Sequence, residues 1–273
     1  MPRKIHAAST QIISEGGASA TLPRIDAVSH AAALLGADVV LFPEMAVHGY
    51  DYGMTEQSLR AVAEPADGAS ARELSAIAAR RGIIVMAGIA ELDRGALYNT
   101  HLIAFPDGRM IAQRKHNLTD IEKAAGMTPG ERRRQVFEIN GVRCALMICA
   151  DNGIDGLPDD LRRDGVELRF LPCGAGGDAA KMLHAADMDS PAARAAYAEN
   201  RTHVCMPGPF DESFAKWGSA FVSCNAVGPM GANTCHQGHC MIVDRHGILR
   251  AQCTGTNVRE FMHEQLINAV LEF

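Results

Sequence analysis

Three polar side chains in this chain stand at the ends of apolar segments. Glu44 closes the run VVLFPE, Lys115 follows IAQR, and Cys149 closes ALMIC. A carboxylate, an ammonium and a thiol supply a base, a cation and a soft nucleophile, the groups needed to open an amide through an acyl-enzyme. A single such residue at a strand end is more often a solvated charge or a small buried side chain. The prediction of a catalytic site therefore depends on the joint occurrence of all three.

Short buried strands are expected to position these residues. The runs 39–42, 102–105 and 144–148 are apolar and are bounded by turn-forming residues, as buried strands are. Active sites of layered α/β folds gather at such strand ends. We therefore expect the three side chains to meet at one edge of a sheet.

The rest of the chain alternates between strand and helix patterns. Strands are predicted at 1–10, 38–42, 83–90, 97–105, 109–114, 136–139 and 142–148, and helices at 22–35 and 70–81, with 157–163 and 167–171 continuing the alternation. Gly82 is a helix stop signal, and Pro106-Asp107-Gly108 and Asn140-Gly141 are hairpin signals. The pattern predicts mixed sheets covered by helices.

Six segments, in order, resemble the nitrilase superfamily of carbon–nitrogen hydrolases. They are ADVVLFPE with Gly49-Tyr50, GIAE with Tyr98-Asn99-Thr100, Arg114-Lys115 with Leu118, Ile148-Cys149-Ala150-Asp151, Asn225-Ala226-Val227-Gly228, and GHCMIVD at 238–244. The resemblance spans most of the chain. It implies an α/β fold, a four-layer α-β-β-α sandwich with mixed sheets, and a Glu-Lys-Cys triad.

The resemblance assigns a role to each reactive residue. Glu44 is the expected base, Lys115 the cation facing the oxyanion, and Cys149 the nucleophile. Many members carry a second catalytic glutamate between the lysine and the cysteine. Glu122 is the best candidate for it by its distance along the sequence, and Glu131 is the second candidate. The alternative interpretation of either residue is a solvated loop charge.

The expected substrate-binding residues are Tyr50, Ala150 and Cys173. Ala150 stands where the family usually has tyrosine and widens the wall beside the nucleophile, whereas nitrile hydrolases usually carry Cys-Trp-Glu there. Asn117 and Cys240 replace a histidine and a serine, and the usual Phe-Pro-Glu after the cysteine is absent. Because this chain has Cys149-Ala150-Asp151 in place of Cys-Trp-Glu, an amide or carbamoyl compound is the expected substrate. Nitrile hydrolysis and an inactive, interaction-only protein remain alternatives.

Composition and charge bear on the number of domains, the partners and the cellular location of the protein. The chain has 273 residues, 47% of them hydrophobic, and a net charge of −6, which fits one domain over 1–273 and offers no attraction to nucleic acid. No segment approaches the roughly 20 apolar residues of a membrane span. The start leads directly into a strand pattern, and the eight cysteines are scattered through apolar runs. We therefore expect a cytoplasmic protein with reduced thiols.

Neither a cofactor nor a metal is expected. The cluster Cys235–Cys240, with two histidines, has the residue types of a zinc site but the wrong spacing, and no second ligand pair lies at the usual separation. A zinc-dependent hydrolase is kept as a third alternative. The turn into a strand that the family resemblance implies is the preferred interpretation.

Two segments are left open. An insertion at about 178–210 is a candidate lid, with the family's next helix end placed either at 198–200 or, preferably, at 214–217. The tail 257–273 is apolar enough to dock. The resemblance implies a homodimer or a higher homo-oligomer.

Overall fold

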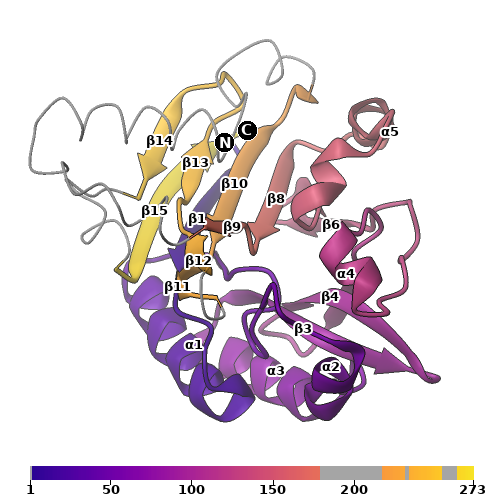
Figure 1. Cartoon of the computed structure of the whole chain (residues 1–273). Helices are drawn as coiled ribbons and strands as arrows, with labels where there is room; N and C mark the ends of the chain where they lie inside the picture. The colour runs from indigo at the N-terminus through magenta and orange to yellow at the C-terminus, as the bar shows by residue number, and fades with distance from the viewer. Residues whose placement is uncertain (1, 179–216, 231–233, 254–262) are drawn as a thin grey trace, which may run out of the picture.

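A computed structural model of the chain describes residues 2–178, 217–230, 234–253 and 263–273, and two six-stranded sheets dominate it (Figure 1). The strands of the first sheet are β1 (Lys4–Gln11), β2 (Val39–Leu41), β3 (Ile84–Asp93), β4 (Ala96–Ala104), β5 (Met110–Arg114) and β15 (Gln265–Glu272). Their order is β15-β1-β2-β3-β4-β5, with β1, β2 and β3 parallel and the others antiparallel to their neighbours.

The second sheet is built from the later strands. They are β6 (Val136–Ile139), β7 (Val142–Leu146), β8 (Leu168–Cys173), β10 (Ala220–Asn225), β13 (Met241–Val243) and β14 (Leu249–Gln252), in the order β14-β13-β10-β8-β7-β6. A small third sheet has the order β11-β12-β9, from β9 (Gly176–Asp178), β11 (Val227–Pro229) and β12 (Thr234–Gln237). Parallel pairing of β7, β8 and β10 in the centre makes the second sheet mixed as well.

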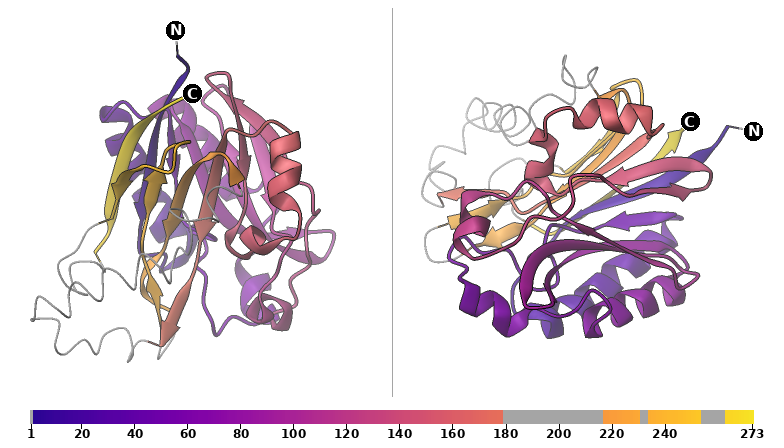
Figure 2. Two further views of the ribbon diagram at one scale, coloured as in Figure 1. Left: turned by 90° about the horizontal axis from the view of Figure 1, so that it is seen from above. Right: turned by 90° about the vertical axis from the view of Figure 1, so that its right-hand side faces the viewer.

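The two large sheets face each other between layers of helix (Figure 2). Helices α1 (Gly17–Leu34) and α3 (Ala69–Arg81) cover the outer face of the first sheet, and α5 (Leu157–Arg163) packs on the outer face of the second. Apolar side chains of both sheets, including Phe105, Phe137 and Phe170, fill the space between them. This helix–sheet–sheet–helix arrangement confirms the predicted four-layer sandwich.

Most predicted elements are present, with shifted ends. Helix α3 ends before Gly82, which adopts φ 69°, and the turns at 106–108 and Asn140-Gly141 join antiparallel strands as expected. The predicted start of α1 at 22 is wrong, because the helix begins at Gly17 and contains Pro23. Ala18 and Leu22 pack on the outer core, and this burial extends the helix past the proline.

The structure describes different shares of the two segments that the sequence left open, 178–210 and 257–273. The proposed insertion at 178–210, apart from its first residue, and the helix ends at 198–200 and 214–216 lie outside the described residues. Of the tail, 263–273 is described, and there β15 pairs with β1 of the same chain, in the register Lys4↔Glu272 to Gln11↔Gln265. The apolar tail therefore docks as an edge strand on its own sheet.

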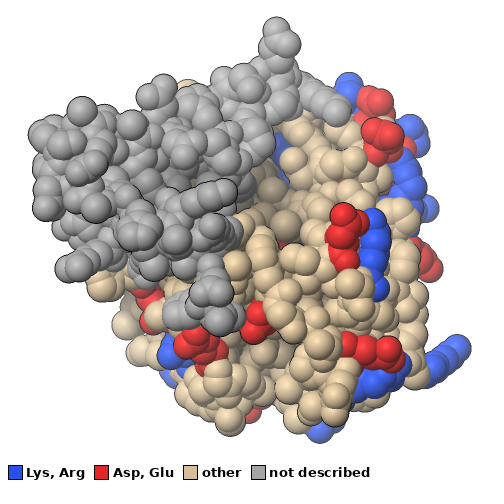
Figure 3. Space-filling view, viewed as in Figure 1, with Lys and Arg blue, Asp and Glu red and all other residues tan. Residues whose placement is uncertain are grey.

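No helix in the described part of the chain is long and apolar enough to cross a membrane. On the face shown in Figure 3, acidic and basic side chains are interspersed, and the centre is largely uncharged. Many of the charges are paired at short distance, as Arg132 is with Asp160 at 2.6 Å. Such exposed pairs contribute little to stability.

Two buried histidines should make the fold acid-sensitive. Burial lowers the pKa of His101 on β4 to about 3 and that of His236 on β12 to about 4, whereas an unfolded chain titrates near 6.5. Below pH 6.5 the unfolded chain binds protons that the folded chain does not, so stability falls as pH falls. We expect the free energy of unfolding to drop by roughly 1.5 kcal/mol per histidine between about pH 6.5 and pH 5, measured by urea titration.

The variant His101→Leu tests this expectation, because it removes one of the two groups. Its free energy of unfolding should depend less steeply on pH than that of the wild type. The matched control is His30→Gln, an exposed histidine on α1. Equal pH slopes for wild type and His101→Leu would contradict the assignment.

Candidate active site

Glu44 lies just past β2 and is held by an unusually close approach of two backbones. Met45, the next residue, adopts φ 48°. A Cβ on Gly88 of β3 would lie 2.2 Å from the Met45 nitrogen, so only glycine fits there. The Glu44 side chain is 1% exposed, and its Oε2 accepts a hydrogen bond from the Gly174 N–H at 2.7 Å. The carboxylate therefore has a fixed position at the ends of β2 and β8.

Lys115 follows β5 and is completely buried. Its Nζ donates to Glu44 Oε1 and to Glu122 Oε2, both at 2.7 Å. An ammonium in such surroundings is retained only when it is paired. The structure thus brings the predicted cation, the predicted base and the predicted second glutamate into one contact group.

Glu122 reaches this group through helix α4 (Asp120–Ala124). It forms a capping box with Thr119, whose N–H donates to Glu122 Oε2 at 2.8 Å. The pattern Thr-x-x-Glu is a sequence signature of a helix start, so the short helix presents its capping carboxylate to Lys115. By contrast, Glu131, the other candidate from the sequence, is exposed.

Asn99 on β4 joins the two glutamates and was given no role from the sequence. Its Nδ2 donates to Glu44 Oε1 and to Glu122 Oε1, both at 2.7 Å. Lys115 and Asn99 therefore both bridge the same pair of carboxylates. Its position in the Tyr-Asn-Thr segment was the available signal, but a polar residue inside a strand does not by itself indicate this contact.

Cys149 begins a short 3-10 turn, η1 (Cys149–Gly153), which follows the end of β7 at Leu146 after two intervening residues. It adopts φ 47°, a conformation that non-glycine residues rarely take and that is often found at functional sites. The buried Asp151 holds this turn, because its Oδ2 accepts the Ile148 N–H at 3.0 Å and the Arg134 Nη1 at 2.8 Å. Cys149 is partly exposed as a residue.

Asp151 also connects the nucleophile turn to the lysine strand. Its Oδ1 accepts the backbone N–H groups of His116 and Asn117 at 2.9 and 2.8 Å. The Asn117 side chain donates to the Ala150 carbonyl at 2.8 Å. The residue that replaces the family's histidine therefore fixes the position of the peptide between Ala150 and Asp151.

The electrostatics of the group favour a proton on Glu44 and a charge on sulfur. Burial and the neighbouring Cys149 raise the pKa of Glu44 well above its usual range, despite Lys115. The pKa of Cys149 is lowered to about 6, first by a hydrogen bond from the Cys173 thiol and also by the charge of Lys115, against the effect of burial. Burial opposes the charge of Lys115, but the surrounding acidic groups outweigh it and hold its pKa well above the usual value.

The three residues expected to bind substrate lie around this group. The Tyr50 ring centroid is 5.8 Å from Lys115 Nζ, and the Tyr50 hydroxyl is 3.1 Å from Thr119 Oγ1. Ala150 is partly exposed beside Cys149, and Cys173 is 7% exposed at the end of β8. Tyr50 thus contacts the lysine side of the group, and Ala150 and Cys173 lie on its thiol side.

The cysteine and histidine cluster near the third sheet forms a turn and a strand. Residues 234–237 belong to β12, and His239 adopts φ 83°. Within the described residues, no three His, Cys, Asp or Glu side chains are grouped so that they could hold a metal ion.

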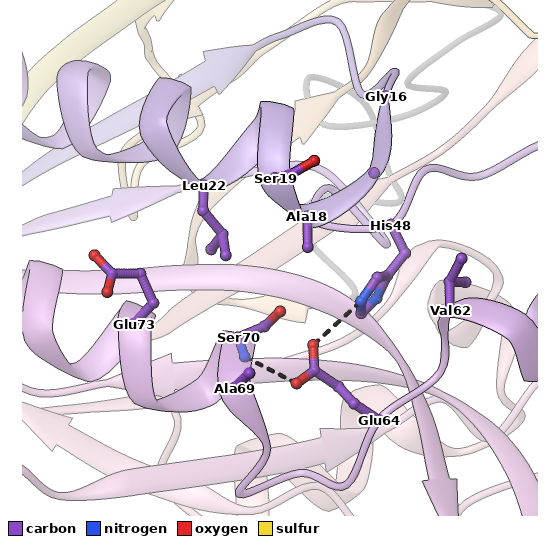
Figure 4. A pocket seen from close by; sticks show the side chains of 11 residues that line it. Gly16, Ala18, Ser19, Leu22, His48, Val62, Glu64, Ala69, Ser70 and Glu73 are labelled. Atoms are coloured by element: carbon purple, nitrogen blue, oxygen red, sulfur yellow. Dashed lines mark hydrogen bonds and ion pairs between the residues drawn. The ribbon is translucent and has the colours of Figure 1, made fainter.

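A separate cavity of about 590 Å³ lies between α1 and α3 (Figure 4). In it His48 Nε2 is 3.2 Å from Glu64, while His48 Nδ1 accepts the Ala90 N–H at 3.0 Å. Glu64 also accepts the N–H of Ser70 at the start of α3. Both nitrogens of His48 are thus engaged, and the pair joins the loop after Glu44 to the helix layer.

The chain resembles known proteins in sequence and in fold. Residues 6–263 match the model of the carbon-nitrogen hydrolase family. The chain is 31% identical over 137 residues to an (R)-stereoselective amidase of Pseudomonas sp, a match that covers 50% of this chain and 48% of that protein. It thus spans about half the length of that relative.

Longer matches are also found. The omega-amidase NIT2 of Xenopus tropicalis is 30% identical over 213 residues, which cover 73% of this chain and 72% of that protein. The fold superposes on a point mutant of the Nesterenkonia AN1 amidase from the nitrilase superfamily, with a TM-score of 0.72 at 20% identity over 98% of this chain and 91% of that one. The chain therefore belongs to the carbon-nitrogen hydrolase family.

Proposed function

We propose that this protein hydrolyses the C–N bond of a small amide or carbamoyl compound through a thioester on Cys149. The observation that carries the proposal is the buried group in which Lys115 bridges Glu44 and Glu122 next to a thiol of lowered pKa. The amidases among its relatives support the same reaction. Glu44, Lys115, Cys149 and Glu122 are the proposed catalytic residues.

In the first half of the proposed reaction, the Cys149 sulfur attacks the carbonyl carbon. Two of the three N–H groups of Lys115 bind the glutamates, and the third is available to the oxyanion, together with the backbone N–H of Ala150. Burial and the neighbouring Cys149 raise the pKa of Glu44, and in the proposed step this carboxyl group gives a proton to the leaving nitrogen. The C–N bond then breaks, leaving ammonia or an amine and a thioester.

In the second half, Glu44 acts as the base. Its carboxylate takes a proton from water, and the hydroxyl oxygen attacks the thioester carbon. The C–S bond breaks, which releases the carboxylic acid, and Glu44 is again protonated beside a Cys149 thiolate. Glu122 holds Lys115 in place through both steps.

The test is intact-protein mass spectrometry during incubation with small amides, carbamoyl compounds and nitriles, with ammonia release followed in parallel. An amide should add the mass of the substrate less ammonia, on the peptide that contains Cys149. A nitrile would first add its full mass, as a thioimidate, which separates the two substrate classes. Ammonia release without a covalent adduct on Cys149 under rapid quenching would contradict the mechanism.

Asn99 should contribute to the reaction by positioning the two glutamates. The variant Asn99→Leu loses both hydrogen bonds to carboxylates, each worth about 1.5–3 kcal/mol. We expect kcat/KM to fall by roughly 100-fold, measured by ammonia release over a range of pH.

The comparison variant Asn99→Asp sharpens this test. It places a third carboxylate against Glu44 and Glu122, so it should be less active than Asn99→Leu at neutral pH and recover partly as pH falls. Nearly wild-type kcat/KM in both variants would show that Asn99 does not position the glutamates.

A further inference from the structure

Cys149 has a second cysteine beside it at the neighbouring strand end. Strands β7 and β8 are parallel, with Cys144 opposite Leu168 and Leu146 opposite Phe170. The Met147 N–H still bonds the Phe170 carbonyl at 2.9 Å, and continuing this register brings Cys149 alongside Cys173. Neighbouring strands are about 4.8 Å apart, which is within the Cα separation that a disulfide spans.

Side-chain contacts agree with the register. Cys149 packs against the apolar cluster that contains the buried Cys173, and Cys173 is the neighbour that lowers the pKa of Cys149 most. The Cys173 Sγ lies 3.9 Å from the Leu171 carbonyl oxygen, to which it donates. Both residues are free cysteines. The backbone of Cys173 is fixed on the other side, because its carbonyl accepts the Glu44 N–H at 3.3 Å.

The two thiols differ in reactivity. Of the seven cysteines that the structure describes, Cys149 alone is not buried. Its pKa near 6 keeps it largely a thiolate at neutral pH, whereas the thiolate of Cys149 and burial keep Cys173 protonated by raising its pKa. An accessible low-pKa thiolate next to a second thiol is the arrangement of a redox-sensitive cysteine and its resolving partner.

We propose that Cys149 and Cys173 form a redox-active pair, in which a peroxide oxidises Cys149 and Cys173 then closes a reversible disulfide with it. The Cys149 sulfur attacks one oxygen of hydrogen peroxide and the O–O bond breaks. Hydroxide departs, and Cys149 becomes a sulfenic acid. The Cys173 sulfur attacks this sulfur, and the hydroxyl group leaves as water with the Cys173 proton. Two thiols lose two electrons, which reduce one peroxide.

The consequence is a reversible block at the reactive thiol. While the disulfide exists, Cys149 cannot form a thioester, and it cannot be oxidised further to the irreversible sulfinic acid. The proposal needs only a reactive Cys149 and holds for any substrate of the enzyme.

The test uses wild-type protein treated with hydrogen peroxide, then alkylated and digested with trypsin without reductant. Cleavage after Arg143, Arg162, Arg169 and Lys181 places Cys149 and Cys173 in different peptides, 144–162 and 170–181. A linked pair of these peptides is the expected product, and fragmentation separates Cys149 from Cys144 within the first. Treatment with dithiothreitol should release the two peptides and restore activity.

The variant Cys173→Ala provides the second measurement. For each protein, the measured quantity is the fraction of its untreated activity that reduction restores after peroxide. This fraction should be at least roughly fivefold smaller for Cys173→Ala than for the wild type, and sulfinic acid should accumulate at Cys149 in the variant. The matched control is Cys253→Ala, which removes a cysteine from the buried pair Cys240 and Cys253 and should behave like the wild type.

Two outcomes would overturn the proposal. One is sulfinic acid forming on Cys149 at the same rate in wild type and Cys173→Ala. The other is a peroxide-dependent disulfide that joins Cys149 to a cysteine other than Cys173. The peptide map of the wild type decides the question by itself if Cys173→Ala does not fold.

Discussion

A Cys149→Ala variant is expected to lose at least about 10⁴-fold in kcat/KM, since removal of a catalytic nucleophile has effects of this size or larger. The fold should survive, because the residue is small and is not fully buried. The left-handed backbone at this position, φ 47°, suits alanine no worse than cysteine. The measurement is ammonia release with the best amide found for the wild type, together with thermal unfolding of both proteins.

Cys144→Ala is the matched control for this variant. Cys144 lies on β7, five residues before Cys149, but it is fully buried in the core between the sheets. Its replacement should lower the unfolding temperature and leave kcat/KM within a few-fold of the wild type. Turnover by Cys149→Ala above about one hundredth of the wild-type rate would rule out the thioester mechanism.

Sequence patterns located the reactive residues because each stands at the end of a local apolar strand. Glu44, Lys115 and Cys149 follow β2, β5 and β7, and periodicity and turn signals are properties of short segments. The same reasoning found the hairpins and the end of α3 at Gly82. The four-layer arrangement came from the family resemblance, since strand pattern alone does not determine how two sheets face each other.

The supporting contacts could not be read in this way, because they join residues distant in sequence. Asn99 is 55 positions from Glu44, and Arg134 is 17 positions from Asp151. A buried hydrogen bond between strands leaves no periodic signal. The start of α1 was missed for a related reason, since the packing of Ala18 and Leu22 on the outer core extends the helix to Gly17.

These contacts explain how a buried group with more acids than bases is stable. Lys115 neutralises one negative charge, and the raised pKa of Glu44 removes another while Cys149 is a thiolate. The neutral amide of Asn99 then satisfies one oxygen of each glutamate without adding charge. One proton is thus shared between Glu44 and Cys149, and the proposed reaction consists of moving it to the leaving nitrogen and replacing it from water.

Lys115→Met should therefore affect both activity and stability. Loss of the cation removes a donor from the oxyanion, and we expect kcat/KM to fall by at least about 10³-fold. It also leaves the Glu122 carboxylate buried without its partner of opposite charge and removes one hydrogen-bond donor from Glu44. Breaking a buried pair in this way costs about 3–5 kcal/mol, measurable by urea titration at pH 7.

The pH dependence identifies the cause of this loss. Without Lys115 no cation opposes the burial that raises the pKa of Glu44, and the pKa of Cys149 loses the lowering effect of the same charge. The folded variant therefore binds more protons than the unfolded chain does. Its stability then falls as pH rises above the unfolded value near 4.3, and its deficit relative to the wild type should be larger at pH 8 than at pH 5. Lys123→Met, which removes an exposed lysine paired with Asp120 on the same helix as Glu122, should show neither effect. A deficit that does not change with pH would mean that Lys115 contributes packing and not the charge on which the proposed site depends.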